Sequence, residues 1–340
     1  MKNKLTYFIS RSSMFGIGFY LIFKETSKDS WISLLLGTLI GIGIIYIYSL
    51  IKKSLNHKDF ITELNKTKVG KLYILVFIIF NLLLICTTLI ILPLFVNSFY
   101  LTHTPKLVVN IPFLLLAIYL ASKDKKVLEN LSSLLCVFSI ITIFLFAFFL
   151  SKYIKLNELI PIFTVKTTSI LKSAFTFGII TSVPDILTIN YSNNNFKNSL
   201  FNYLLGVSTL FVILFFTILA LGSPLIEIYS FPEYAVLKKI NVLNFIENIE
   251  NISSFIWYFD MYMMLSINIR NLKDSLPRKF NSVILYSLLT ICLLFSSLTI
   301  GGNYSIILIF VKYYPLILFS FFIIFSTLII YLKYKKNVQN

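Results

Sequence analysis

The sequence contains few charged residues and very few acidic ones. Charged side chains make up 13% of the 340 residues, whereas hydrophobic side chains make up 57%. Soluble domains carry about 25% charged residues. The composition therefore excludes a soluble domain and indicates a polytopic membrane protein. Only 14 residues are acidic against 30 Lys and Arg, a net charge of +16. These basic residues lie mostly between apolar runs, where they orient the chain against an anionic lipid bilayer, so we expect no nucleic-acid partner.

The sequence also lacks the residue clusters that most catalytic and metal sites need. Its two histidines, His57 and His103, fall in polar loops, where we expect them to be solvated. The three cysteines, Cys86, Cys136 and Cys292, each lie in an apolar run and have no CxxC spacing. No pair of carboxylates and no set of metal ligands occurs near an expected membrane interface. We therefore expect no enzyme activity, no cofactor, no metal ion and no disulfide framework.

Apolar runs of bilayer length recur along the whole chain. Windows of about 20 residues predict an all-α protein with about ten transmembrane helices, which we treat as a single transporter-like domain over residues 1–340. The first residues, MKNKLTYFIS, lead directly into a span, so we expect no cleavable signal. The predicted spans are residues 5–23, 31–51, 72–98, 107–121, 129–150, 167–190, 199–221, 243–269, 280–299 and 304–332.

The basic residues predict which ends of the spans are cytoplasmic. If the N-terminus is inside, 20 of the 30 Lys and Arg, Arg11 among them, fall in the inside segments, and 8 fall in the outside loops. Short loops rich in Lys and Arg stay in the cytoplasm, so both termini are predicted to be cytoplasmic. The basic segment 151–166 is the exception, because this orientation places it outside.

The first span is interrupted by two glycines, in the string Phe15-Gly16-Ile17-Gly18-Phe19. One interpretation is that the glycines allow a neighbouring helix to pack closely. The other is that the helix unwinds here and turns free amides toward a ligand, as in transporters with discontinuous helices. Taken alone, the glycines do not decide between the two.

Within the sixth span, the stretch 173–189 carries Gly178, Pro184 and Asp185 within about two helical turns. Proline removes a backbone N–H group and glycine destabilises helix, so a continuous helix is not expected. Irregular backbone at membrane depth is tolerated only where protein buries it or where it lines a cavity, which indicates a binding site. The alternative is a simple proline kink, with Asp185 reaching toward one interface.

The two interruptions open the first and the second group of five spans. Paired interruptions at corresponding places in two halves are typical of inverted-repeat transporters with a site at the membrane midplane. Span eight adds Asp260 as a second deep carboxylate, whereas Glu247 and Glu250 near its start are expected to face water.

Two loops are predicted to have structure of their own. Residues 223–241 form the longest external loop, which either folds over an outward entrance or is an inert connector. Residues 56–71 are expected to include a short amphipathic helix on the membrane surface, capped by Asn56 or Asp59, with an apolar face made of Phe60, Ile61 and Leu64.

Several strings along essentially the whole chain match those of a known family. They are ISRSSMFGIGF, Lys28-Asp29-Ser30-Trp31, Leu101-Thr102-His103-Thr104-Pro105, Leu159-Ile160-Pro161, Ser230-Phe231-Pro232 and NFIENIENISSFIW. In these strings the chain resembles the B subunits of nutrient germinant receptors of spore-forming bacteria, the GerA-type spore germination permeases of the amino acid, polyamine and organocation transporter superfamily. Residues 123–126 and Glu129 depart from the family, in which many members carry a Gly-Glu pair and an Arg in this region.

The resemblance implies a five-plus-five inverted repeat with broken helices 1 and 6. It also implies a site for a small nutrient, often an amino acid, between the broken spans one and six and the faces of spans three and eight. Family members act as sensors in the inner membrane of the dormant spore, together with an A subunit and a lipoprotein C subunit. The resemblance does not establish sustained transport.

We combine these inferences in one hypothetical site for a zwitterionic nutrient. Amides at Gly16 to Gly18 would meet its carboxylate, and carbonyls of a break at Phe177 to Thr181 would meet its ammonium. Alternatives are a proton- or sodium-coupled permease for amino acids or polyamines, a membrane enzyme, and an assembly scaffold. The candidate ligand-binding residues are Phe15, Gly16, Ile17, Gly18, Phe19, Phe177, Gly178, Thr181, Asp185 and Asp260.

Overall fold

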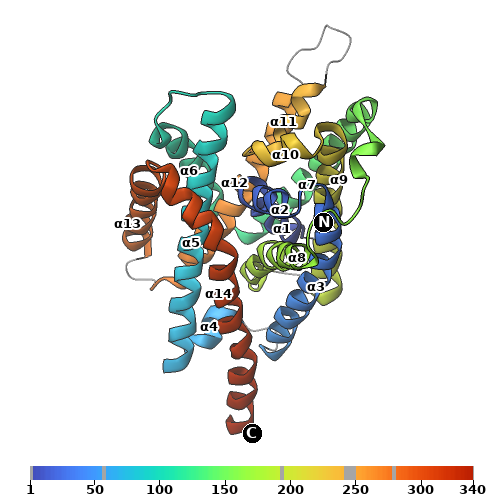
Figure 1. Cartoon of the computed structure of the whole chain (residues 1–340). Coiled ribbons are helices and arrows are strands. Elements are labelled where there is room, and N and C mark those ends of the chain that lie inside the picture. Colours follow the sequence, from blue (N-terminus) through green and yellow to red (C-terminus); the bar gives the residue numbers. More distant parts are fainter. Residues whose placement is uncertain (1–2, 56–58, 192–194, 241–249, 278–280, 340) are drawn as a thin grey trace. The chain divides into compact units, whose positions relative to one another are not determined.

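Most of the residues that the structure describes are helical, and none of those residues lies in a strand. The structure is a computed structural model that describes residues 3–55, 59–191, 195–240, 250–277 and 281–339. Each of the ten predicted spans overlaps a helix or a pair of consecutive helices (Figure 1). The α-helices are α1 (Leu5–Ser12), α2 (Phe19–Thr26), α3 (Ser30–Ser54), α4 (Phe60–Leu64), α5 (Lys68–Phe99), α6 (Lys106–Ser122), α7 (Lys125–Leu150), α8 (Thr167–Ser182), α9 (Phe196–Leu221), α10 (Ser223–Ile228), α11 (Pro232–Ala235), α12 (Glu250–Ser275), α13 (Asn281–Leu294) and α14 (Tyr304–Gln339). Short 3-10 or π segments connect or extend several of them: η1 (Met14–Gly18), η2 (Ser27–Asp29), η3 (Ser151–Tyr153), η4 (Leu156–Leu159), η5 (Val183–Thr188), η6 (Val236–Lys239) and η8 (Phe295–Ile300).

The length and composition of these helices suit a bilayer. Within the described residues, seven helical stretches are long and apolar enough to cross a membrane. One of them, Leu5–Ser54, joins the first two predicted spans, and Lys106–Ser122 is a shorter apolar helix of 17 residues. Helix α12 has 26 residues but is more polar. The chain is therefore an all-α polytopic membrane protein, which confirms the fold class that the composition predicts.

The chain divides into two compact units that interleave along the sequence. Unit 1 comprises Met1–Ile44, Asn130–Pro184 and Lys197–Asp260. Unit 2 comprises Ile45–Glu129, Asp185–Phe196 and Met261–Asn340. Each unit is described by itself below. The expectations of a single domain and of an inverted repeat stay predictions.

In unit 1, two helices approach each other backbone to backbone. Gly37 of α3 faces Gly178 of α8, and a Cβ added to Gly178 would lie 2.8 Å from the carbonyl oxygen of Gly37. A Cβ added to Gly37 would lie 2.4 Å from the carbonyl oxygen of Ala174. Side chains are thus excluded from this contact, as at other close helix crossings in membranes. Helices α1 and α2 pack on α8 in the same unit (Figure 1).

Asp29, at the turn between α2 and α3, fixes the segment that leads into α8. Its buried carboxylate accepts backbone N–H bonds from Phe163 (3.1 Å), Thr164 (2.7 Å) and Val165 (3.3 Å), and the hydroxyl of Thr164 donates at 2.9 Å. Phe163 has a φ of 61°, which a bulky residue rarely adopts. The carboxylate of Asp29 therefore supplies the hydrogen bonds that hold this segment in an unfavourable backbone conformation.

Unit 2 is organised around α5. An apolar cluster joins α5 to α6, α13 and the second half of α12 through residues such as Leu89, Leu114, Leu265 and Leu285. Helix α14 runs along α5 through aromatic contacts, including Phe80 with Phe325 at 5.5 Å between ring centroids (Figure 1). Such contacts supply the van der Waals packing that holds helices together in lipid.

The predicted amphipathic helix in the loop after α3 is present as α4. Phe60, Ile61 and Leu64 are buried as the pattern predicts, and the ring of Phe60 packs on that of Phe77 in α5 at 5.4 Å. Asp59 occupies the capping position, without a side-chain hydrogen bond to the helix end. The other proposed cap, Asn56, and the loop histidine His57 lie outside the described residues, whereas His103 lies exposed in its loop.

Replacing Asp29 by Ala should destabilise the protein. The change removes the charged acceptor of three backbone N–H groups in a partly exposed segment, and a hydrogen bond to a charged group contributes about 1.5–3 kcal/mol, less where water can replace the acceptor. We expect the melting temperature of the purified protein to fall by several degrees. Glu227→Ala, which removes an exposed carboxylate from α10, is the control and should leave it unchanged. Equal melting temperatures for Asp29→Ala and wild type would contradict the role assigned to Asp29.

Candidate functional site

The first span is broken at the residues that the sequence indicates. Helix α1 ends at Ser12 and α2 begins at Phe19, and between them Phe15 (φ −66°, ψ 129°) and Gly16 (φ 79°, ψ −39°) leave the helical conformation. The positive φ of Gly16 is readily available only to glycine. Of the two open interpretations, unwinding is therefore correct for Gly16.

The other residues of this string have packing roles. Gly18 is helical, and a Cβ there would lie 2.4 Å from the sulfur of Met14. Ile17 is buried, and the ring of Phe19 lies 5.9 Å from that of Phe15 and 6.0 Å from that of Phe23. The break thus depends on Gly16, while the residues after it return to a packed helix.

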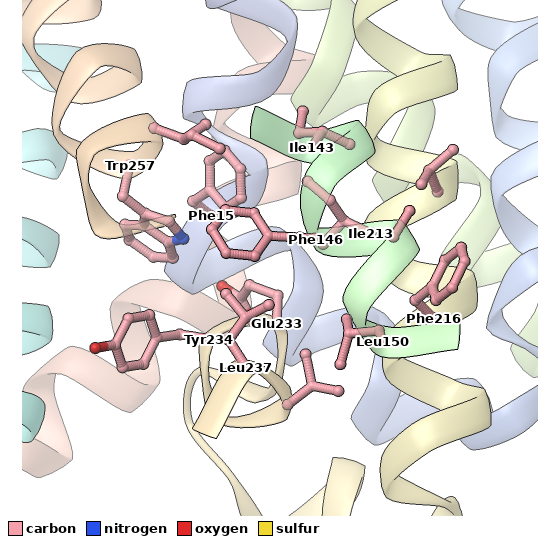
Figure 2. A pocket seen from close by; sticks show the side chains of 14 residues that line it. Phe15, Ile143, Phe146, Leu150, Ile213, Phe216, Glu233, Tyr234, Leu237 and Trp257 are labelled. Carbon is pink, nitrogen blue, oxygen red and sulfur yellow. The ribbon is translucent and has the colours of Figure 1, made fainter. Parts of the chain in front are cut away.

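A pocket opens beside the break, within unit 1. Its cavity volume is about 50 Å³, which leaves room for a small group of atoms beyond a single water molecule. Figure 2 shows Phe15 and Trp257 side by side at one wall, with side chains of α7 and α9 opposite and Glu233 of α11 below Phe15. The ring centroids of Phe15 and Trp257 are 4.7 Å apart. The lining residues are Phe15, Ile143, Phe146, Ala147, Leu150, Val212, Ile213, Phe216, Glu233, Tyr234, Val236, Leu237, Ile256 and Trp257.

Glu233 is the only charged side chain among these lining residues. Its Oε1 accepts a long hydrogen bond, 3.4 Å, from the backbone N–H of Gly16 in the break. Its Oε2 is buried and has no hydrogen-bond partner among the described residues. Helix α11, which carries Glu233, lies in the sequence between the long helices α9 and α12. Burial raises the pKa of the Glu233 carboxyl to about 8. The sequence gives no sign of a role for Glu233 beyond its place in the loop 223–241, for which covering an entrance was one of two expectations.

Next to Phe15 lies a fully buried ion pair. Nη2 of Arg11 in α1 donates to Oδ2 of Asp260 in α12 at 3.0 Å, and both side chains are 0% exposed. Nη1 of Arg11 also donates to the hydroxyls of Ser139 (3.0 Å), Thr209 (3.2 Å) and Tyr7. The guanidinium lies 5.5 Å from the centre of the Phe15 ring. Charged residues inside membrane proteins are usually paired in this way, because an unpaired charge is costly in hydrocarbon.

Comparison with known proteins decides the family. The family model described as "Spore germination protein" matches residues 3–305. The chain belongs to this spore germination protein family. It is also 26% identical over 242 residues to a Bacillus subtilis (strain 168) protein named "Putative spore germination protein YfkT", a match that covers 70% of this chain and 67% of that protein. The chain is thus a germination-related integral membrane protein.

Arg11 corrects one assumption of the orientation analysis, which counted it among the cytoplasmic loop residues. The structure instead places it in α1 with no exposed surface, because its charge is met by Asp260. Polarity alone could not distinguish an arginine at the membrane edge from one paired inside the protein. The bias of the remaining basic residues still points the same way, and the orientation of the termini stays a prediction.

The predicted break at Phe177 to Thr181 is wrong. Helix α8 continues through Ser182, so the carbonyls of this segment lie within an α-helix, and the hydroxyl of Thr181 donates to the carbonyl of Phe177 at 2.8 Å. The change of conformation comes later, where α8 gives way to the 3-10 segment η5 one residue before Pro184. Gly178 serves the close contact with α3, and Phe177 and Thr181 are buried within unit 1. None of these three residues lines the pocket.

The two candidate carboxylates have different surroundings. Asp260 is close to Phe15 through Arg11, but it is engaged in the ion pair and does not line the pocket. Asp185 belongs to unit 2, where it is 4% exposed and accepts a hydrogen bond from the hydroxyl of Thr188 at 3.3 Å. Glu247 lies outside the described residues, as does the side chain of Glu250.

The Arg11–Asp260 pair should be strongly coupled. Arg11→Met or Asp260→Leu alone leaves an uncompensated buried charge, which costs about 3–5 kcal/mol in comparable pairs, whereas the double change removes both charges. We expect each single variant to melt well below wild type and the double variant to melt above both. Thermal unfolding of the four purified proteins completes this cycle. Additive losses in the double variant would show that the two groups do not stabilise each other.

Glu233 should make stability fall as pH rises. Its carboxyl has a pKa of about 8 when folded, against 4.5 in an ordinary environment, so the folded state binds the extra proton between these values. Stability from this group is fully present below pH 4.5 and is lost as pH rises through 8. We expect Glu233→Gln to flatten the decline in melting temperature between pH 5 and pH 8, while Glu227→Gln keeps the wild-type slope. Identical slopes for wild type and Glu233→Gln would contradict a raised pKa.

Proposed function

We propose that the chain is the nutrient-binding membrane subunit of a spore germinant receptor, and that it binds a small nutrient such as an amino acid. In this proposal it works without catalysis, in the spore inner membrane, with both termini cytoplasmic and with A and C subunits as partners. Membership of the spore germination protein family supports the germination role. The nutrient role rests on the pocket.

The observation that carries the proposal is the pocket at the break of the first span. Phe15, at the break, lines the pocket, and the backbone N–H group of the adjoining Gly16 donates to Glu233, the charged side chain of an otherwise apolar and aromatic lining. A concave, mostly apolar cavity with few polar groups is the usual form of a small-molecule site. A nutrient here would contact Phe15 at the break itself. This position replaces the hypothetical site at Phe177 to Thr181.

Signalling requires that the nutrient bind one conformation better than another. Two parts of the pocket suit such a change. The backbone at Phe15 and Gly16 has already left the helix, so it can rotate without breaking further helical hydrogen bonds. Segments α11 and η6 contribute Glu233, Tyr234, Val236 and Leu237 to the pocket. A nutrient that contacts these residues would favour the position that α11 and η6 hold in the structure.

A proton- or sodium-coupled amino acid permease is the second candidate. The buried Arg11–Asp260 pair favours it, because paired charges in membrane helices mark ion and substrate paths in transporters. Uptake of labelled amino acids into vesicles that contain this subunit alone would distinguish the two. Substrate accumulation would support the permease, and binding without accumulation would support the sensor.

Gly16→Ala should abolish the nutrient response. A Cβ is strained at a φ of 79°, so the variant should restore regular helix and displace Phe15 from the pocket wall. Spores carrying Gly16→Ala should lose germination with the nutrient that activates wild type, with the protein still present in the membrane fraction. Gly43→Ala is the matched control, since a Cβ there meets no atom within 4 Å. A wild-type dose response in Gly16→Ala would refute the proposed site.

A further inference from the structure

The pocket beside the broken helix contains one charge and a large apolar surface. Every lining side chain other than Glu233 is aliphatic or aromatic. In Figure 2 the carboxylate of Glu233 lies below Phe15, while the hydroxyl of Tyr234 points away from it. A ligand in this pocket would therefore meet hydrocarbon on most sides and a carboxylate at one point.

The hydrogen bonding of Glu233 is incomplete. Oε1 accepts a hydrogen bond from the N–H group of Gly16 at 3.4 Å, the carboxyl also accepts from its own backbone, and Oε2 is buried without a partner among the described residues. A carboxylate can accept about four hydrogen bonds. Buried polar atoms are nearly always paired in folded proteins, so an unpaired oxygen at the edge of a cavity indicates a missing donor.

The charge of that donor follows from the surroundings of Glu233. The structure shows no salt bridge to Glu233 within the described residues, and Arg11 of the same unit pairs with Asp260. Burial without a counter-charge raises the pKa of Glu233, so a cation in the pocket would favour the ionised carboxylate, whereas an anionic ligand group would oppose its ionisation. An ammonium group supplies both a positive charge and three N–H donors.

The rest of the ligand follows from the walls. Phe15 and Trp257 lie side by side on one wall, and Phe146 and Phe216 contribute further rings. Aromatic faces attract cations and also bury apolar groups well. A compound with a short apolar chain would fill the pocket while its ammonium group reached Glu233.

We propose that the pocket binds an apolar compound through a primary ammonium group that pairs with Oε2 of Glu233. This rests on the proposed function and narrows it, because the nutrient then has to carry an amino group, as an amino acid with an apolar side chain does. Sugars and nucleosides without an amino group are excluded as ligands of this pocket.

The experiment compares ligands of equal length and different charge on the purified full chain in detergent. Hexylamine, hexanoate and 1-hexanol are titrated separately, and the melting temperature reports binding by mass action. We expect hexylamine to raise the melting temperature of wild type, and hexanoate and 1-hexanol to have little effect. Trimethylhexylammonium, which keeps the charge but has no N–H donor, should bind more weakly than hexylamine. This series uses only the wild-type chain, so it does not depend on whether a variant folds.

Two variants then locate the charge. Glu233→Gln keeps the size of the side chain and should weaken hexylamine binding by about 10- to 100-fold, which is the usual effect of losing a charge-assisted pair. Glu227→Gln removes an exposed carboxylate and should bind hexylamine as wild type does. Unchanged hexylamine binding by Glu233→Gln overturns the proposal.

The remaining outcomes also decide. Equal stabilisation by hexylamine and 1-hexanol would indicate a site for hydrocarbon such as a lipid chain, and stabilisation by hexanoate alone would indicate an anion site; either overturns the proposal, as does the absence of any shift with hexylamine. Failure of this inference is distinguishable from failure of the proposed function. If a nutrient without an amino group triggers germination through this chain, only the inference falls. If hexylamine binds through Glu233 but spores lacking the chain germinate normally with every nutrient, only the receptor function falls.

Discussion

The ion pair between Arg11 and Asp260 determines how the first span can be broken. An interrupted helix in a membrane loses part of its own hydrogen bonding and needs a fixed neighbour to hold its two pieces. Arg11 lies just before the break and ties α1 to α12, while its second nitrogen is held by hydroxyls of α7 and α9. Because the piece before the break is anchored on three sides, the irregular backbone at Phe15 and Gly16 can persist and form the wall of a pocket.

Much of the fold follows from the sequence, because the signals that define it are local. The predicted spans overlap helices, and the helical spacing of the apolar residues Phe60, Ile61 and Leu64 correctly indicated α4. The break at Gly16 was one of two interpretations that the sequence left open, because glycine permits both unwinding and close helix packing. These features depend on composition and on neighbours only a few residues away.

The site was harder to predict, because its parts are far apart in sequence. Glu233 lies 217 residues from Gly16 and Asp260 lies 249 residues from Arg11, and one sequence gives no sign that either pair meets. Gly178 and Pro184 suggested a second break, but their roles differ. Gly178 permits close packing, and the proline comes only where α8 has already changed to a 3-10 turn. The same residue type thus serves unwinding at Gly16 and tight packing at Gly178, and only its neighbours decide.

The contact between Gly37 and Gly178 has a mechanical consequence. With bare backbones pressed together, α3 and α8 cannot slide along each other without driving Ile40 into the backbone of α8. Asp29, next to the start of α3, accepts hydrogen bonds from the segment that precedes α8, and so connects the two helices at one end. Within unit 1, α3 and α8 are therefore held in a fixed position relative to each other. A conformational change at the pocket is therefore expected in the broken first span, whose backbone leaves the helical conformation at Gly16, and not between α3 and α8.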